Sequence, residues 1–280
     1  MNHGSIVTEV PALVPCTKGA SMGADDFERH FSTLFGQRWP ALKDALLAPG
    51  DAVEYSAGLT SSYHLDSASV SAARLLRLPE SGEILDACAA PGGKSLVLAS
   101  RMSPGSTLLC NELSSDRRRR LSDVLDDHLD EDRRRRVRVS GFDAAAAGGR
   151  LSERGRFAAI LLDAPCSSER HVLRDQKALE RWTPARIRFL AQRQWSLLSS
   201  TFLLLAPGGS LVYVTCALSP DENDGPMRRL FKKYGEDAIS DVIEEGEAPA
   251  FEFTEYGIQY LPDRSYGSGP LYVARVKRSS

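Results

Sequence analysis

Two cysteines of this 280-residue chain stand where a run of apolar residues gives way to polar ones. Cys166 closes the segment Leu161–Cys166, which also contains Asp163, and Cys216 closes the segment Val212–Cys216. A deprotonated thiol is a strong nucleophile, and a carboxyl group beside it can hydrogen-bond to a substrate or exchange a proton with it. These residue types indicate covalent catalysis by a thiol.

A free cysteine is more often a small buried hydrophobe than a reagent, so each cysteine also has a purely structural interpretation. As regards catalysis, we adopt that interpretation for Cys16, Cys88 and Cys110. For Cys166 and Cys216, the position at the end of an apolar run favours a functional role. Composition and periodicity do not distinguish the two thiols from each other.

The runs that carry these thiols indicate buried strands. A continuous aliphatic run that stops abruptly is typical of a parallel strand at the carboxyl edge of its sheet, where α/β proteins hold their active sites. Such runs occupy Ile84–Asp86, Thr107–Cys110, Val137–Val139, Phe157–Leu162 and Leu211–Val214. A long amphipathic helix is predicted over Ile187–Leu198, and Leu271–Val276 is predicted to close the sheet. The fold class is therefore α/β, a mostly parallel twisted sheet flanked by helices.

A glycine turn follows the first of these strands. The sequence Ala89-Ala90-Pro91-Gly92-Gly93-Lys94 precedes a helical pattern that includes Leu96 and Met102. Paired glycines let the backbone approach a ligand closely, and the helix start offers free N–H groups to it. A nucleotide-like cofactor is implied, with a plain loop as the alternative. The spacing fits neither the dinucleotide nor the phosphate-loop signature, which disfavours a nicotinamide dehydrogenase.

Two carboxylates follow neighbouring strands at the same predicted edge. Glu112 ends an apolar strand about twenty residues after the turn, where an α/β nucleotide fold places the acid that accepts ribose hydroxyls. Its alternative is a solvated surface acid. Asp143 follows the next strand and is suited to accept a hydrogen bond from an adenine amino group.

The chain divides into three predicted parts. Residues 1–24, rich in small residues, are expected to form a flexible leader. Residues 25–80 form an N-terminal helical extension, with Asp25 or Asp26 as a cap, aromatic residues at helical spacing, and a further helix over Tyr63–Leu78. Residues 81–280 form the catalytic domain, in which the low-complexity segment Ala144–Gly149 is predicted to be a loop.

Cysteine content and hydropathy limit the classes of protein to which the chain can belong, whereas its charge neither supports nor excludes an RNA partner. The 35 basic and 37 acidic residues give a net charge of −2, so no global positive field indicates a nucleic-acid partner. The arginine runs at 117–120 and 133–136 are predicted to be solvated helix faces, although they could touch phosphates. Five cysteines without a C-x-x-C pair argue against disulfides and against a metal site. The sequence predicts no membrane span and a cytoplasmic location, or a mitochondrial one if the chain is eukaryotic.

Three segments, Asp86–Ser95, Asp163–Cys166 and Thr215–Pro220, resemble the motifs of the Nol/Nop/Sun family of RNA (cytosine-5) methyltransferases, which includes the bacterial RsmB-like enzymes. Their joint occurrence in this order is specific, and the likeness extends from about Phe27 to Lys277. Within the family, Phe35–Pro40, Glu169–His171 and Gly269–Tyr272 are most similar to the mitochondrial ribosomal RNA branch.

The resemblance implies a Rossmann-like fold that binds S-adenosylmethionine. It assigns the methionine and ribose parts of this cofactor to Cys88, Ala89, Ala90, Pro91, Gly92, Gly93 and Lys94. It assigns the ribose to Glu112 and the adenine to Asp143 with Ala144, while Arg117 borders the cofactor. The family usually has Asp at the position of Glu112, Gly at that of Ala144, and often Ser at that of Ala217.

The resemblance also implies catalytic roles. Carbon 5 of cytosine is a weak nucleophile, so a thiolate must first add at carbon 6, and Cys216 matches the family's nucleophile. Asp163 matches the acid beside cofactor and base, where it would hydrogen-bond ring nitrogen 3. Cys166 matches the cysteine that helps release the product, and Lys94 or the cofactor sulfonium would favour the thiolate. An exchange of the two cysteine roles would leave the reaction class unchanged.

The implied substrate is a cytosine in RNA, which is ribosomal RNA in the family branch named above. The cytosine is expected to come from a single strand or to be flipped out of a stack. Its access route would be lined by Arg170, His171, Arg174 and Lys177. The sequence predicts no sizeable accessory RNA-binding domain, so a protein partner or a ribosomal subunit is expected to supply recognition. The alternatives are a tRNA cytosine-5 methyltransferase, an inactive relative that binds RNA or cofactor, and a methyltransferase for small molecules or proteins.

Overall fold

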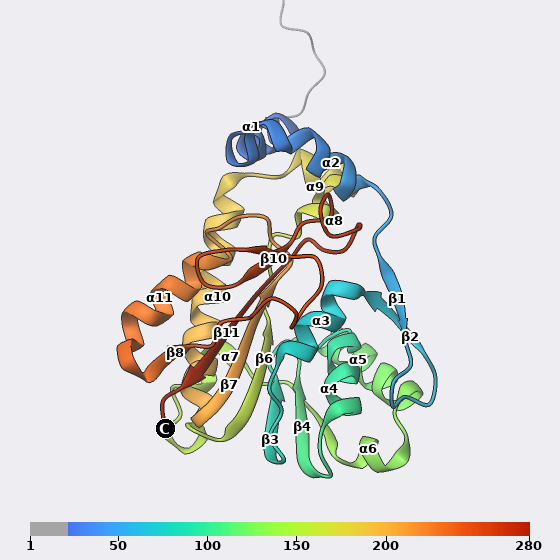
Figure 1. Cartoon of the computed structure of the whole chain (residues 1–280), viewed down its shortest axis with the longest axis vertical. Coiled ribbons are helices and arrows are strands. Elements are labelled where there is room, and N and C mark those ends of the chain that lie inside the picture. Colours follow the sequence, from blue (N-terminus) through green and yellow to red (C-terminus); the bar gives the residue numbers. More distant parts are fainter. Residues whose placement is uncertain (1–21) are drawn as a thin grey trace, which may run out of the picture.

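A nine-stranded sheet lies at the centre of the computed structural model, which describes residues 22–280 (Figure 1). The strand order is β5-β4-β3-β6-β7-β11-β10-β9, with β8 paired to β11. The parallel strands are β3 (Ser81–Asp86), β4 (Gly105–Asn111), β5 (Val137–Ser140), β6 (Phe157–Asp163) and β7 (Leu205–Thr215). The antiparallel strands are β8 (Ala238–Ser240), β9 (Glu252–Phe253), β10 (Ile258–Tyr260) and β11 (Leu271–Arg278).

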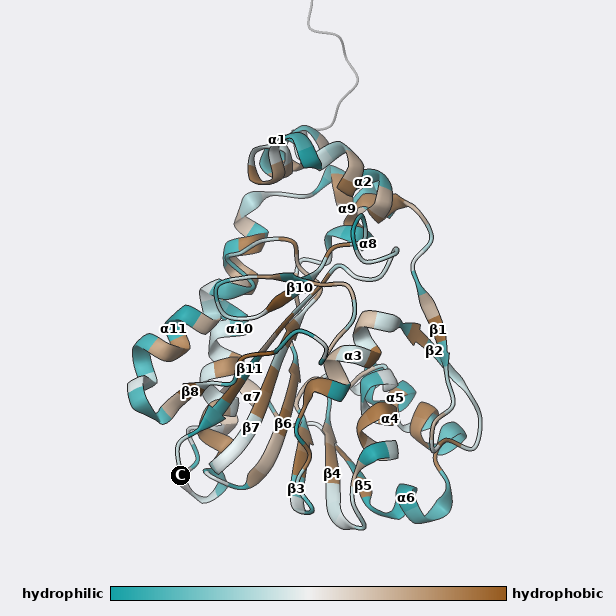
Figure 2. Cartoon of the chain, in the orientation of Figure 1, coloured by the Kyte–Doolittle hydropathy of each residue, from teal (hydrophilic) through white to brown (hydrophobic). Residues whose placement is uncertain are grey.

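The parallel strands are apolar because both faces of the sheet are covered by helices, and Figure 2 shows them as the most hydrophobic part of the chain. On one face, α3 (Ser67–Leu75), α4 (Gly93–Arg101) and α5 (Ser115–His128) enclose one core, and α6 (Glu131–Arg135) leads into β5. On the other face, α7 (Ala144–Ala147), α10 (Pro184–Leu204) and α11 (Asp224–Tyr234) enclose a second core.

The strand order reverses between β3 and β6, and this reversal determines where a ligand can lie. The chain runs outward from β3 through β4 to β5, and then returns to place β6 on the other side of β3. Ligands of open α/β sheets bind at such a switch point, outside the carboxyl ends of the strands. Asp86 ends β3 and Asp163 ends β6, so both carboxylates are placed at this point.

A separate aromatic core joins the N-terminal helices to the catalytic part of the chain. Helices α1 (Met22–Phe35) and α2 (Trp39–Leu47) pack beside α8 (Glu169–Arg174) and α9 (Gln176–Glu180), at the top of Figure 1. Phe27, Phe31 and Trp39 are buried with Trp182, and the Phe31 and Trp39 rings stack 5.3 Å apart. Short 3-10 helices occupy Gly36–Arg38, Leu151–Glu153 and Gly235–Asp237.

Three local predictions differ from the structure. Helix α1 already starts at Met22, so Asp25 lies in its first turn, and the rest of the predicted leader, residues 1–21, lies outside the described residues. The predicted helix over Tyr63–Leu78 begins instead with a strand, β2 (Tyr63–Asp66), which pairs with β1 (Ala52–Tyr55). Helix α3 starts only after Asp66, whose carboxylate accepts the N–H of Ala68 at 2.9 Å.

The segment Ala144–Gly149 was predicted to be a loop, but its alanines form the one-turn helix α7. Alanine has the highest helix propensity, and the carboxylate of Asp143 accepts the N–H of Ala145 at 3.0 Å as an N-cap. Asp143, the residue predicted to bind adenine, is thus also the N-cap of a helix.

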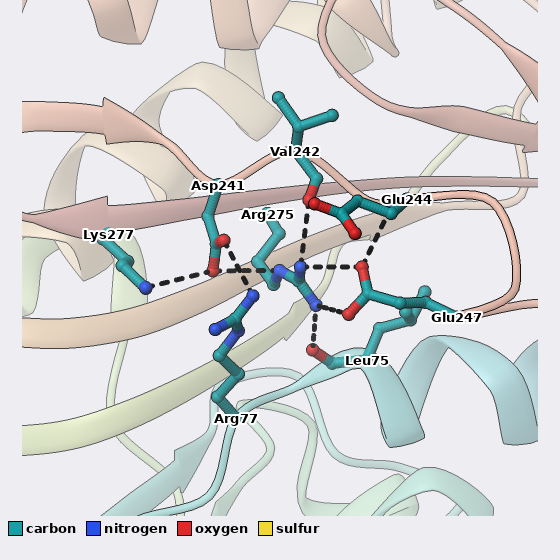
Figure 3. Close-up of polar contacts among 8 residues, drawn as sticks. All are labelled: Leu75, Arg77, Asp241, Val242, Glu244, Glu247, Arg275 and Lys277. Atoms are coloured by element: carbon teal, nitrogen blue, oxygen red, sulfur yellow. Dashed lines mark hydrogen bonds and ion pairs between the residues drawn. The ribbon is translucent and has the colours of Figure 1, made fainter.

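A buried arginine joins the antiparallel part of the sheet to α3. Arg275 on β11 is 2% exposed and donates to both carboxylate oxygens of Glu247 at 3.1 and 3.0 Å (Figure 3). It also donates to the carbonyls of Leu75 and Val242, and its Nε lies 3.0 Å from Asp241. These acceptors compensate the buried charge of Arg275. Since they belong both to the end of α3 and to the segment after β8, Arg275 holds that segment against α3.

No helix among residues 22–280 is long and apolar enough to cross a membrane.

Candidate active site

The two cysteines meet at the carboxyl edge of the sheet because their strands are neighbours. Asp163 near the end of β6 is in register with Val214 on β7, so the segments that follow both strands emerge together. The Sγ atoms of Cys166 and Cys216 are 2.7 Å apart, and the backbone N–H of Cys216 donates to Cys166 Sγ at 3.2 Å. Both cysteines are free thiols.

The surroundings of the two sulfurs favour the thiolate at Cys216. The hydrogen bond from Cys166 lowers the pKa of Cys216, burial opposes this effect, and a hydrogen bond from Ser168 adds to it. The same contact with Cys216, together with burial, raises the pKa of Cys166 well above its ordinary value. The sequence predicted that Lys94 or the cofactor sulfonium favours the thiolate. In the structure, the largest contributions that lower the pKa of Cys216 come from its hydrogen bonds with Cys166 and Ser168. Burial raises the pKa of both Cys88 and Cys110, which disfavours a thiolate at either.

A lysine and an aspartate form an ion pair next to the thiols. Lys94, in the first turn of α4, donates from Nζ to Oδ2 of Asp163 at 2.9 Å. Burial alone would lower the pKa of Lys94, but the neighbouring Asp163 carboxylate outweighs it and the pKa is raised. Lys94 therefore stays an ammonium at neutral pH, held at the switch point of the sheet.

Two pockets meet at this ion pair. The thiol pocket, of 440 Å³, is lined by Cys216, Ser168, Asp163 and Lys94, with a wall formed by 269–271. The turn pocket, of 230 Å³, is lined by the glycine turn, by Asp86 at the end of β3, and by Tyr63 and His64 of β2. Lys94, Asp163 and Ser69 line both pockets. A group bound in one pocket can therefore contact a group bound in the other.

A third pocket continues the turn pocket along the sheet edge. This carboxylate pocket, of 400 Å³, is lined by Glu112, Arg117, Asp143 and Ala144, and Cys88 lines both it and the turn pocket. Its walls also include the apolar side chains of Leu113, Phe142, Pro165 and Leu197. Two acceptors beside an apolar slot suit the ribose and the adenine of a nucleoside.

The predicted cofactor residues divide between these pockets. Ala89, Ala90, Pro91, Gly93 and Lys94 line the turn pocket. Gly92 lines neither the turn pocket nor the carboxylate pocket.

The glycine turn is required by packing on both of its sides. Gly92 has φ +122°, and a Cβ there would lie 2.9 Å from Cγ1 of Val124 on α5. A Cβ on Gly93 would lie 2.9 Å from the ring of Tyr63, on the pocket side. Gly92 therefore allows α5 to pack, whereas Gly93 keeps the turn pocket open.

Buried polar side chains fix the two cysteine segments to each other. Glu169, three residues after Cys166, accepts the N–H of Leu218 at 2.9 Å. Glu222, six residues after Cys216, accepts the N–H of Ser167 at 3.0 Å and the side-chain amide of Gln194 on α10 at 2.7 Å. The hydroxyl of Ser167 contacts both carboxyl groups. Each segment thus carries an acid that binds the other, which holds the thiols in place.

The arginines predicted to line an access route have structural partners. Arg170 lines the thiol pocket, but its guanidinium donates to the carbonyls of Ala45, Leu46, Gly267 and Gly269. Arg174, also on the pocket wall, donates to the carbonyls of Leu47 and Ala48. Cations at these positions compensate the C-terminal end of α2. His171 lines the same pocket, whereas Lys177 is exposed on α9 and does not line it.

The two arginine runs also have neighbours within the fold. Arg134 pairs with Asp126 at 2.5 Å and Arg135 with Asp132 at 2.6 Å, as expected for a solvated helix face. Arg117 donates to the carbonyl of Ala90 at 2.8 Å and lies 3.3 Å from Glu112, so it braces the glycine turn. Among residues 22–280, no three or more His, Cys, Asp or Glu side chains form a group that could hold a metal ion.

Several residues of this site were missed by sequence reasoning. Tyr63 and His64 come from a hairpin whose strand pattern is too short to signal a pocket wall. Ser168 and Glu169 lie in the motif run after Cys166, and this proximity was the available signal. Glu222 and Gln194 carry no local signal, because only the tertiary fold brings them to Ser167.

The sequence is similar to a known protein family and to several curated proteins. Residues 73–277 match the family described as 16S rRNA methyltransferase RsmB/F. The ribosomal RNA small subunit methyltransferase F of Vibrio campbellii is 31% identical over 244 residues, which make up 86% of this chain and 49% of that protein. The chain thus spans about half the length of the curated relatives it matches. Its similarity to a mitochondrial branch stays a prediction.

Solved structures share the fold. NSun6 from Pyrococcus horikoshii with SFG is 24% identical with a TM-score of 0.62, covering 80% of this chain and 54% of that one. A methyltransferase homolog protein from Pyrococcus horikoshii is 20% identical with a TM-score of 0.69, covering 90% and 94%. The predicted methyltransferase-type α/β fold is confirmed.

Proposed function

Because the chain belongs to the 16S rRNA methyltransferase RsmB/F family, we propose that it transfers a methyl group from S-adenosylmethionine to carbon 5 of a cytosine in ribosomal RNA. The observation that carries the proposal is the meeting of two thiols, 2.7 Å apart, beside the Lys94–Asp163 pair where two pockets join. Methyl transfer to an oxygen or nitrogen would need no thiol.

The turn and carboxylate pockets fit the cofactor. Glu112 would accept the ribose hydroxyls and Asp143 the adenine amino group, while Leu113 and Phe142 would border the adenine. The glycine turn and Lys94 would hold the methionine end, and the carboxylates of Asp86 and Asp163 would face the positive sulfonium. When bound, S-adenosylmethionine supplies the methyl group. The structure of NSun6, a fold relative, contains SFG, an analogue of this cofactor.

Cys216 is the proposed nucleophile. Its thiolate would add to carbon 6 of the cytosine, forming a C–S bond and moving the electron pair of the 5,6 double bond toward carbon 5. The lowered pKa of Cys216 and its position on the wall of the thiol pocket support this role. Asp163, held by Lys94, would orient the ring by contact at its polar edge.

Cys166 would complete the reaction. After methyl transfer, carbon 5 carries both a methyl group and a proton, and a base must remove that proton before the C–S bond can break. Cys166 reaches Cys216 directly. In the adduct it would first give its own thiol proton to water and then, as a thiolate, accept the carbon 5 proton, so that the C–H electron pair re-forms the 5,6 double bond and Cys216 leaves as a thiolate. The raised pKa of Cys166 suits a group that holds a proton at rest and takes one back in this step.

The target base must leave any stack to reach the thiol pocket, which supports a single-stranded or flipped cytosine. The two arginines on its wall, Arg170 and Arg174, already donate to backbone carbonyls. We therefore propose that an assembled ribosomal subunit or a protein partner supplies part of the recognition. The relative from Vibrio campbellii is named for the small ribosomal subunit, which makes that subunit the first candidate.

Bisulfite sequencing of total RNA from cells with and without the gene tests the proposal, because it reports the reaction, the base and the position together. The expected result is one or more protected cytosines in small-subunit rRNA that become convertible when the gene is deleted and are restored by the wild-type gene but not by Cys216→Ala. Protected cytosines lost from tRNA instead would favour the tRNA alternative. No lost cytosine in any RNA would overturn the proposal.

A further inference from the structure

Ser168 adopts a backbone conformation that is unusual for a residue with a side chain. Its φ is 55° and its ψ is 58°, in the left-handed region, where L residues other than glycine, asparagine and aspartate are uncommon. Non-glycine residues in sparsely populated conformations occur most often at functional sites, where the surrounding fold maintains them. The position of this serine at the start of α8 therefore calls for a physical reason.

Helix capping does not supply that reason. Ser168 precedes α8 as its N-cap residue, and serine is favoured there because its hydroxyl accepts a backbone N–H. The Ser168 hydroxyl makes no such bond with α8. It turns toward the cysteines instead, with Oγ 3.1 Å from Cys216 Sγ and 3.5 Å from Cys166 Sγ.

The donors and acceptors around the sulfurs favour one direction for these contacts. The backbone N–H of Cys216 donates to Cys166 Sγ, and the proton of the Cys166 thiol is free to point toward Cys216. The Ser168 hydroxyl has one proton, and its sulfur contact at Cys216 is shorter than its contacts at Cys166 Sγ or at the Cys166 carbonyl, 3.4 Å. Cys216 Sγ is thus the favoured acceptor of two hydrogen bonds.

From this geometry we infer that Ser168 is a catalytic residue, which donates a hydrogen bond to the Cys216 thiolate and aims that sulfur into the thiol pocket. The inference rests on the proposed function, in which Cys216 is the nucleophile. Ser168 itself lines the pocket and so is placed beside the reacting atoms.

The charges that face Cys216 show why a neutral donor is useful there. Lys94 on α4 favours the thiolate, but its ammonium is hydrogen-bonded to Asp163 of β6. Asp163 opposes the thiolate by its negative charge, as does Glu169 of α8 when it is ionised, and Cys166 is a further titratable neighbour. A hydroxyl adds a donor without adding a charge that would attract either carboxylate away from its present partner.

The expected kinetic effect can be bounded. A hydrogen bond to a charged group that changes the pKa by about one unit changes the thiolate fraction about tenfold below that pKa. The intrinsic nucleophilicity of a thiolate falls about threefold for the same pKa decrease. Loss of the Ser168 hydroxyl should therefore slow adduct formation about threefold at neutral pH, beyond any effect of misorientation.

Two substitutions separate the hydroxyl from the backbone. Ser168→Gly removes the hydroxyl and suits the left-handed conformation, so the fold is retained. Ser168→Ala removes the same hydroxyl but keeps the strained Cβ. The rate of iodoacetamide alkylation of each cysteine is measured against pH by peptide mass spectrometry on the full chain, with Ser69→Ala as a control that removes another hydroxyl from the same pocket.

Both Ser168 variants should move the alkylation midpoint of Cys216 upward by about one pH unit, and Ser69→Ala should leave it unchanged. An unshifted midpoint in Ser168→Gly, or a shift in only one of the two variants, would overturn the inference. Alkylation needs neither RNA nor cofactor. If the wild-type protein forms the RNA adduct but the Ser168 variants show no shift of the midpoint, only the role of Ser168 is refuted. If the midpoint shifts in the variants but the wild-type protein methylates no RNA, only the proposed function is refuted.

Discussion

Glu169 and Glu222 both contact the hydroxyl of Ser167, and all three side chains are fully buried. A hydroxyl has one proton, so it can donate to only one of two carboxylates. One carboxyl group must therefore carry a proton of its own. Burial raises the pKa of Glu222 as well, but Glu222 accepts hydrogen bonds from the Ser167 N–H and from Gln194, and it is the better stabilised anion of the two. Glu169, whose pKa is raised to about 7 by burial and then by the charge of Glu222, holds the proton.

This proton makes the stability of the fold depend on pH. The ordinary pKa of Glu169 is 4.5 and its folded value is about 7, so the folded state holds a proton that the unfolded state releases over this range. The stabilisation is fully present below pH 4.5 and is lost as the pH rises to about 7. Glu169→Gln keeps a donor for Ser167 but does not titrate.

Relative to wild type, the Glu169→Gln variant should therefore gain stability between pH 5 and pH 8, on the order of 2 to 3 kcal/mol. Urea unfolding of both proteins at the two pH values measures this gain. Other titrating groups, such as Asp86, are present in both proteins, so their contributions cancel when the free energies of unfolding are compared. Glu236→Gln, at an exposed position, should show no such gain. An equal difference between variant and wild type at both pH values would show that Glu169 holds no extra proton.

The roles of the two cysteines can be separated with RNA that contains 5-fluorocytidine, from which the covalent adduct cannot be released. Cys216→Ala should abolish the adduct, whereas Cys166→Ala should still form it, because only Cys216 makes the bond to carbon 6. Denaturing gel electrophoresis detects the adduct, and calorimetry with S-adenosylmethionine checks that both variants still bind the cofactor. The reverse pattern would assign the attack to Cys166.

Asp163→Asn should lower kcat/KM for RNA methylation by about 10²- to 10⁴-fold, the range typical of a positioned acid or base. The side chain of Asp163 is 30% exposed, so the free energy of unfolding should change little. Without this carboxylate, the effect of burial lowers the pKa of Lys94, so a smaller fraction of Lys94 carries a positive charge. Initial rates with tritiated cofactor measure the effect, and Asp221→Asn, an exposed acid five residues after Cys216, is the matched control. A loss below about tenfold would remove Asp163 from the reaction.

Arg170→Met should destabilise the fold by about 2 to 4 kcal/mol, because it leaves several backbone carbonyls without their donor. The same change at the exposed Arg119 should have almost no effect. Chemical denaturation compares the two variants. If Arg170→Met weakened RNA binding while the free energy of unfolding stayed at the wild-type value, the side chain would be an RNA contact and not a structural one.

The parallel half of the sheet could be predicted from the sequence because its strands are continuous aliphatic runs that end in polar residues. The meeting of Cys166 with Cys216 followed from the same pattern, since neighbouring parallel strands end at one edge. The pairing of β1 with β2 could not be foreseen, because Tyr63–Asp66 is short and leads directly into a helix. The Ala144–Ala147 helix was missed because low complexity suggested a loop, although alanine and the cap at Asp143 favour a helix.

The polar support of the site lay beyond sequence reasoning for a different reason. Gln194, Glu222 and Ser167 are separated by 28 and 55 positions, and no local pattern links them. Arg170 was predicted to line the access route of the target base because it follows Cys166 in the chain. The carbonyls that its guanidinium binds, such as that of Ala45, 125 positions away, have no side-chain signature.

The wall of the thiol pocket at 269–271 leads directly into β11, where Tyr272 is in register with Thr215 on β7. Both thiols precede this wall in the chain by more than fifty positions. During synthesis, the thiols therefore leave the ribosome while the pocket that should shelter them is still open on one side. Only when β11 has emerged and paired with β7 is the wall at 269–271 in place, so the thiol pocket is completed by a segment that is synthesised after both thiols.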